Sequence, residues 1–164
     1  MYKIGDFVVY RQVNVCKIEG VCYPTFEANA KRKYYKLSSV FTNNGTTVFV
    51  PIDSKDGLRA VSDKNFLEQA LLELSSVKPA VFVAKKPPQL TAYYQEILSS
   101  NDLRKYLYLI KEVTIKERSN PKKLSEIDNR FKHKAEQLVC EEFAVVFNVP
   151  PEQIKERLYA SMGL

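Results

Sequence analysis

The pattern of hydrophobic and polar residues changes near residue 62. Before it, β-branched and aromatic residues stand in short runs separated by turn-forming residues, which is typical of a small antiparallel sheet. The predicted strands cover residues 7–10, 14–21, 34–41, 46–52 and 58–61. After residue 62, hydrophobic residues recur every three or four positions, which indicates helices. We therefore expect an α+β fold with a β domain over residues 1–62 and an all-α helical bundle over residues 63–164.

The turn residues and the length of the β domain indicate which strands pair and which kind of β fold they form. Asn43-Asn44-Gly45 separates the third and fourth predicted strands and tolerates the positive φ of a tight turn, so these strands should pair directly. Alternation assigns Val48 and Val50 to the core. Pro51 cannot donate a backbone hydrogen bond and should end its strand or lie at an edge. Sixty residues are too few for a two-layer sandwich but enough for a Tudor-like or SH3-like small β-barrel.

Capping residues divide the second half into helices. Ser62-Asp63 provides an N-cap for the first, and Ser125 with Asp128 resembles a capping box for a long fourth helix. The other helices are predicted over residues 89–99, after Asn101 or Asp102, and from Pro150-Pro151. The proline-rich segment 76–88 is a candidate linker, which we interpret as a connection between domains.

The charge of the chain is concentrated in one segment. The protein has 164 residues and a formal net charge of +6, from 25 Lys and Arg against 19 Asp and Glu. Residues 104–134 alone contain ten basic residues against four acidic ones. A local basic surface is typical of contacts with nucleic-acid phosphates, although it is also typical of a solvated helix surface.

No motif supports catalysis or metal binding. The single histidine, His133, lies between two lysines without a second histidine, and no Gly-rich phosphate loop or nucleophile motif occurs. Cys16, Cys22 and Cys140 lack zinc-finger spacing, and we interpret Cys16 and Cys22 as small buried residues. We expect no enzyme activity, metal, cofactor or small-molecule substrate. Without a long apolar run, we also expect no membrane association and a cytoplasmic location.

Several motifs in the β half resemble a known family. They are Ile4-Gly5-Asp6-Phe7-Val8-Val9-Tyr10, Tyr34-Tyr35-Lys36-Leu37, Val48-Phe49-Val50-Pro51-Ile52-Asp53 and Gly57-Leu58-Arg59-Ala60-Val61. In this order they resemble the CarD-like (CdnL-type) bacterial transcription regulators, whose N-terminal module also occurs in the transcription-repair coupling factor. The resemblance continues through residues 98–102, 124–125 and 130–138, and so covers nearly the whole chain.

The resemblance implies a function in transcription initiation. A Tudor-like, RNA-polymerase-interacting domain would bind the β subunit of bacterial RNA polymerase, and the helical domain would bind double-stranded promoter DNA at the upstream edge of the transcription bubble. The polymerase-binding candidates are Lys36, Thr46, Thr47, Phe49 and Pro51. The DNA-binding candidates are the cations and the neighbouring apolar residues Lys85, Lys86, Leu90, Tyr93, Lys122, Lys123, Arg130 and Lys134.

Two alternatives to DNA binding remain. One follows from a difference between this chain and the family, and the other from the many functions that small β-barrels have. Relatives commonly carry a tryptophan that wedges against the minor groove, whereas this chain has no tryptophan and has Pro87, Pro88 and Leu90 in that neighbourhood. Tyr93 and Tyr94 could instead be core residues. The chain could therefore be a polymerase-binding adaptor without significant DNA affinity. An RNA-binding β module is a further alternative, although we expect the aromatic residues of the β half to lie in its core.

Overall fold

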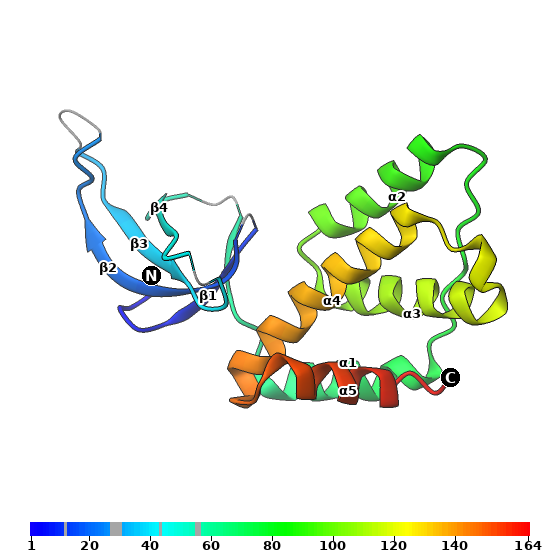
Figure 1. Cartoon of the computed structure of the whole chain (residues 1–164). Helices are drawn as coiled ribbons and strands as arrows, with labels where there is room; N and C mark the ends of the chain where they lie inside the picture. The colour runs from blue at the N-terminus through cyan, green and yellow to red at the C-terminus, as the bar shows by residue number, and fades with distance from the viewer. Residues whose placement is uncertain (12, 27–30, 43, 55–56) are drawn as a thin grey trace. The chain divides into compact units, whose positions relative to one another are not determined.

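The computed structural model describes residues 1–11, 13–26, 31–42, 44–54 and 57–164. The chain divides into two compact units, Met1–Val61 and Ser62–Leu164. The first unit contains a five-stranded antiparallel sheet and the second contains helices (Figure 1). The predicted α+β class, with a small β domain followed by a helical part, is confirmed.

The strands lie close to their predicted positions. They are β1 (Phe7–Tyr10), β2 (Asn14–Cys22), β3 (Tyr34–Ser39), β4 (Thr47–Pro51) and β5 (Leu58–Ala60). Their order in the sheet is β4-β3-β2-β1-β5. β3 and β4 pair directly, as the hairpin signal predicts, with Leu37 opposite Val48. In the intervening turn Gly45 has a φ of 58°, whereas Asn43 lies outside the described residues.

One side of the sheet carries the core of the β unit. Its most buried members are Val8, Cys16, Ile18, Tyr35, Leu37 and Val50. Val50 is buried and Val48 packs against the cluster from its margin, so the predicted alternation along β4 is correct. Among the described strands, β4 pairs with β3 and β5 pairs with β1, which leaves one side of each as a sheet edge.

The helices of the second unit begin at the predicted caps. They are α1 (Lys64–Ser76), α2 (Pro87–Ser99), α3 (Leu103–Ser119), the short 3-10 helix η1 (Pro121–Lys123), α4 (Glu126–Phe147) and α5 (Pro151–Ala160). The side chains of Asp63, Asp102 and Ser125 accept backbone hydrogen bonds at the starts of α1, α3 and α4. α2 begins two residues before its predicted start, because proline fits the first turn of a helix.

The segment between Ser76 and Pro87 has a different position from the one we predicted. It lies inside the helical unit and connects α1 to α2, whereas the division between the units falls between Val61 and Ser62. The interpretation of this segment as an interdomain connection is therefore wrong. Its prolines explain why it is not helical, but the composition does not show which elements it joins.

Helix α3 is the centre of the helical unit. It packs against α1, α2 and α4, and α4 in turn packs against α5 (Figure 1). Its buried residues include the apolar Leu107, Ile110 and Val113 and also the charged Lys111 and Glu112. A helix that is surrounded by neighbours buries more than one stripe, and this places polar side chains inside the unit.

The two faces of the sheet predict that substitutions at two neighbouring residues of β3 have very different effects on stability. Leu37 is fully buried in the core, whereas Lys36 is exposed on the opposite side. Leu37→Ala should lower the free energy of unfolding of the β unit by about 3 kcal/mol, because it leaves a cavity. Lys36→Ala, the matched control, should change it by less than about 0.5 kcal/mol. Chemical denaturation followed by the tyrosine circular dichroism measures both, and equal effects would contradict the assignment of faces.

Candidate protein and nucleic-acid interfaces

The edge strand β4 presents alternate side chains away from the core. Thr47 and Phe49 are exposed and Pro51 is partly buried, while Val50 between them faces inward. The cross-strand register places Lys36 of β3 opposite Phe49, and Lys36 is exposed as well. An edge strand with exposed side chains on one face can accept a further strand from a partner.

The predicted polymerase-binding residues are gathered by this geometry. Lys36, Thr47, Phe49 and Pro51 lie on paired strands on the outer side of the sheet. Thr46 immediately precedes β4, is exposed, and accepts a backbone hydrogen bond from Ser39 at 3.5 Å. Pro51 ends β4 at the edge of the sheet, as predicted.

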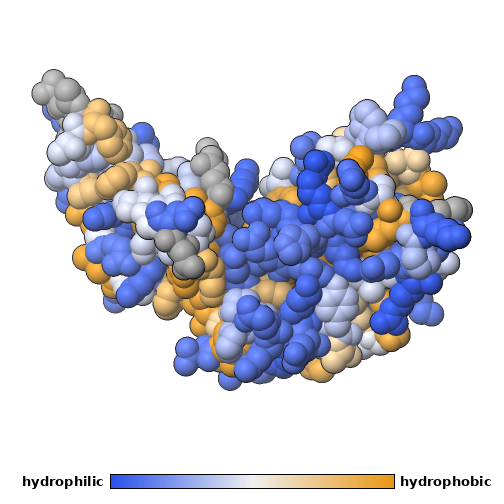
Figure 2. All heavy atoms as spheres, viewed as in Figure 1, coloured by the Kyte–Doolittle hydropathy of each residue, from blue (hydrophilic) through white to orange (hydrophobic). Residues whose placement is uncertain are grey.

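The outer side of the sheet also carries aromatic rings that the sequence analysis placed in the core. The ring of Phe26, which is 66% exposed, lies 5.6 Å from that of Phe49 and 5.9 Å from that of Tyr34 between centroids. Tyr23 is exposed too, so the expectation of buried aromatic residues is correct for Tyr35 and wrong for Phe26 and Tyr23. We call Phe26, Tyr34 and Phe49 the aromatic face. In Figure 2 hydrophobic residues reach the surface of the β unit.

The sequence offered only a weak signal for Phe26. It follows Pro24-Thr25, outside the alternation of any strand, so its burial could not be derived from a period. A large apolar residue in a turn-forming stretch is a reason to consider a surface role.

Several of the basic side chains between residues 104 and 134 form ion pairs or hydrogen bonds within the helical unit. Arg104 forms an ion pair with Glu73 at 3.2 Å, and Lys132 forms one with Glu117 at 2.7 Å. Lys111 is buried and donates to the backbone carbonyls of Leu74 and Ser75 at the end of α1. The formal charge of this segment therefore overstates what it presents to DNA.

Other cations of the DNA-binding prediction are exposed. Arg130 and Lys134 lie one turn apart on the same face of α4, and Lys122 is exposed in η1. Lys123 completes η1, and its side chain lies outside the described part of the structure. Lys85 and Lys86 are exposed just before α2, where their backbone N–H groups donate to Oε1 of Gln89 at 3.0 and 3.3 Å.

Of the apolar members of the DNA-binding prediction, one is buried and the other is half-buried. Leu90 is only 6% exposed, so it cannot wedge against a minor groove and this assignment is wrong. Tyr93 is half-buried, and its ring stacks on that of Phe82 at 4.3 Å between centroids. Tyr94 is buried, as its helical position predicted.

A buried carboxylate on α3 holds the segment that precedes α2. Glu112 accepts hydrogen bonds from the backbone N–H of Phe82 at 2.8 Å and from the hydroxyl of Tyr93 at 2.9 Å. Burial raises the pKa of Glu112 above its usual range. Burial, together with the adjacent Glu112, also raises the pKa of Tyr93 to about 12. These contacts fasten the segment to α3 at Phe82, three residues before the exposed Lys85.

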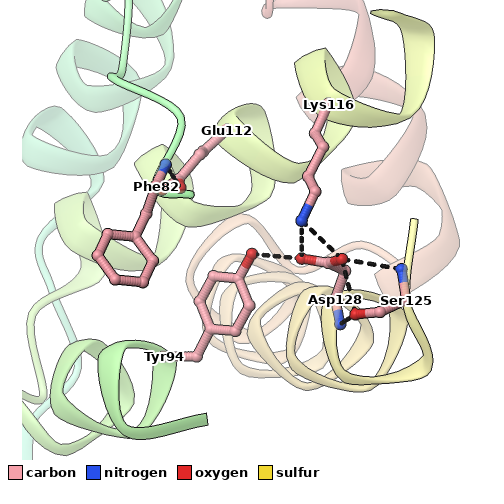
Figure 3. Close-up of polar contacts among 6 residues, drawn as sticks. All are labelled: Phe82, Tyr94, Glu112, Lys116, Ser125 and Asp128. Atoms are coloured by element: carbon pink, nitrogen blue, oxygen red, sulfur yellow. Dashed lines mark hydrogen bonds and ion pairs between the residues drawn. The ribbon is translucent and has the colours of Figure 1, made fainter. Parts of the chain in front are cut away.

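A second buried carboxylate, that of Asp128, joins α2, α3 and the start of α4 (Figure 3). Its Oδ1 accepts from the Tyr94 hydroxyl at 2.7 Å, and both oxygens accept from Nζ of Lys116 at 2.8 to 2.9 Å. Its Oδ2 also accepts from the backbone N–H and the hydroxyl of Ser125, which completes the predicted capping box. Burial alone would raise the pKa of Asp128, but the hydrogen bonds from Lys116 and Ser125 hold it below its usual value.

The described residues contain neither a group of metal-ligating side chains nor a helix long and apolar enough to cross a membrane. Cys16 and Cys140 are buried, and Cys22, predicted to be buried, is partly exposed. The described features are instead an open sheet edge with aromatic neighbours and a set of exposed cations near the starts of α2 and α4. Both are suited to binding macromolecules.

One comparison with known protein families finds a match within the first unit. Residues 2–62 match the family model of the CarD-like/TRCF RID domain. This range contains all five strands and every polymerase-binding candidate, and residues 63–164 lie outside it. The search of curated proteins found no match.

The Asp128 network predicts a specific loss of stability. Asp128→Asn removes the charge that compensates Lys116, so the free energy of unfolding of the helical unit should fall by about 3 kcal/mol near neutral pH. Because the folded pKa lies below the ordinary value of 3.8, the stabilisation is present above that value and is lost as the pH falls through the folded pKa. The difference between wild type and variant should therefore shrink in acid.

The measurement is urea denaturation followed by helical circular dichroism over a series of pH values. Glu126→Gln is the matched control, since Glu126 is exposed in the same first turn of α4 and should contribute less than about 1 kcal/mol. A difference between wild type and Asp128→Asn that stayed constant with pH would contradict the role of the ionised carboxylate.

Proposed function

We propose that this chain regulates bacterial transcription initiation, because residues 2–62 match the family model of the CarD-like/TRCF RID domain, an RNA-polymerase-interacting domain. Its β unit binds the β subunit of RNA polymerase through β4. Its helical unit contacts double-stranded promoter DNA near the upstream edge of the transcription bubble. In this arrangement, the polymerase selects the promoter and the chain modulates its opening.

The observation that carries the proposal is the open edge at β4 within the matched domain. β4 pairs with β3 on one side, and its exposed Thr47 and Phe49 lie beside the exposed Lys36. Main-chain hydrogen bonds to such an edge give affinity, while the side chains that flank it give specificity. This supports strand pairing with a partner more than binding through a deep pocket.

The DNA contact is supported by the exposed cations of the helical unit. The exposed cations are Lys122 on η1 and Arg130 and Lys134 on α4. Asp128 holds the position at which α4 begins. Side chains that neutralise phosphates release condensed counterions, and they position DNA without recognising its bases. Binding of this kind is weak and nearly independent of sequence, which suits a protein that is brought to DNA by the polymerase.

One observation favours the alternative of a polymerase-binding adaptor without significant DNA affinity. The chain has no tryptophan and Leu90 is buried, so of the described wedge candidates Pro87 and Pro88 are exposed, and a proline presents less ring surface to a minor groove than a tryptophan does. In addition, Arg104, Lys116 and Lys132 form ion pairs within the unit. The two functions differ in whether the remaining exposed cations meet phosphates.

The polymerase contact predicts a loss of binding without a loss of fold. Phe49→Ala should weaken binding to RNA polymerase by about 1 to 2 kcal/mol, because it removes an aromatic anchor beside the paired strand. The measurement is equilibrium binding of the full chain to core polymerase and to the isolated lobe of the β subunit, with circular dichroism as a check on folding.

Phe7→Ala is the matched control for this experiment. Phe7 is 38% exposed, close to the 36% of Phe49, but it lies on β1, on the far side of β2 and β3 from the β4 edge. It should bind like wild type. Equal binding by Phe49→Ala and wild type would contradict the use of β4.

The DNA contact predicts a change in salt dependence. If Lys122, Lys123, Arg130 and Lys134 each meet a phosphate, replacing all four with alanine should flatten the log–log salt slope of duplex binding by about 3 to 4 units. The affinity should fall alike for unrelated sequences. Fluorescence anisotropy at several salt concentrations measures the slope.

The control replaces four exposed lysines elsewhere, namely Lys3, Lys17, Lys64 and Lys78, with the same change in net charge. It should leave the slope close to that of wild type. A quadruple variant of the DNA-binding set with the wild-type slope would favour the adaptor.

A further inference from the structure

The aromatic face extends beyond the edge strand. Phe26 belongs to the connection after β2, yet its ring contacts both Phe49 of β4 and Tyr34 of β3. At 66% it is much more exposed than Phe49. Apolar rings that gather at the surface beside an open strand edge are typical of an interaction site rather than of a core.

The angles between these rings indicate the kind of group that fits. The ring of Phe26 is inclined at 67° to that of Phe49 and at 80° to that of Tyr34. Rings inclined so steeply form a corner, which suits an aliphatic or aromatic side chain, whereas successive nucleic-acid bases stack on flat ring faces. The geometry therefore favours a protein partner.

The charges around the corner restrict that partner further. Lys36 is exposed directly opposite Phe49, and Nζ of Lys33 lies 6.0 Å from the ring centroid of the exposed Tyr23. The carboxylates nearby have contacts of their own, because Asp53 pairs with Arg32 at 2.7 Å and Glu19 accepts from the Ser38 hydroxyl at 2.7 Å. A partner with carboxylates would complement the two lysines.

We propose that the polymerase segment that pairs with β4 inserts an apolar side chain into the corner between Phe26 and Phe49 and places a carboxylate beside Lys36. The inference rests on the proposed function and adds Phe26, which lies outside the motifs that resemble the family, as a specificity-determining residue. The strand edge supplies hydrogen bonds that any extended segment can make. The corner selects the segment by its side chains.

The test compares variants of the full chain for binding to core RNA polymerase. Phe26→Ala should weaken binding about tenfold, while Phe26→Leu should retain most of it, because leucine still offers an apolar wall. Lys36→Glu should slow association and reverse its dependence on salt, because it repels the partner's carboxylate. Phe7→Ala serves again as the control for an exposed phenylalanine. Unchanged circular dichroism and thermal unfolding show that each variant is folded.

The outcomes separate this inference from the proposed function. If the wild-type chain does not bind polymerase, the proposed function is wrong. If wild type binds, Phe49→Ala weakens binding and Phe26→Ala binds like wild type, only the present inference is overturned. Binding to an oligothymidine single strand tests whether the rings bind nucleic acid instead. The inference is also overturned if Phe26→Ala keeps its affinity for polymerase but loses binding to that strand. A Phe26→Ala/Phe49→Ala variant that loses less than the product of the two single effects would support a shared corner.

Discussion

The helical unit depends on one buried negative charge. Asp128 is fully buried, and its two oxygens receive hydrogen bonds from Tyr94 of α2, Lys116 of α3 and Ser125 at the start of α4. A charge in the interior is tolerated only when its partners are complete, and here each partner comes from a different part of the unit. The network therefore sets where α4 begins. It thereby places η1, together with the exposed cations around it, at a defined position on the unit.

Helix α3 shows the same principle in two adjacent residues of opposite charge. Lys111 donates to the carbonyls of Leu74 and Ser75, which the end of α1 leaves without helical partners. Burial, together with nearby Lys78, lowers the pKa of Lys111. Glu112 holds the backbone of Phe82 from another side of the helix. Lys111 and Glu112 would be expected on the surface from their charge alone. In the structure they fasten the end of α1 and the segment before α2 to the core.

The difference between what could be predicted and what could not follows from the range of the interactions. The caps at Asp63, Asp102 and Ser125 depend on residues three or fewer positions away, so local patterns revealed them. The pairing of β3 with β4 followed from alternation and a short turn. The burial of Leu90, the pairing of Lys116 with Asp128 and the surface position of Phe26 depend on tertiary neighbours. For this reason the total charge of residues 104–134 was a poor measure of the charge that a ligand would meet.

The short length of β4 affects how the chain behaves in concentrated solution. Every free copy exposes an unsaturated strand edge, and such edges favour pairing with one another. β4 has five residues and ends at Pro51, which cannot donate, so two copies joined at this edge would share few hydrogen bonds. We expect backbone pairing alone to be too weak to hold identical molecules together. We therefore expect a short edge flanked by selective side chains to favour pairing with a partner of matching side chains over pairing with a second copy of the chain.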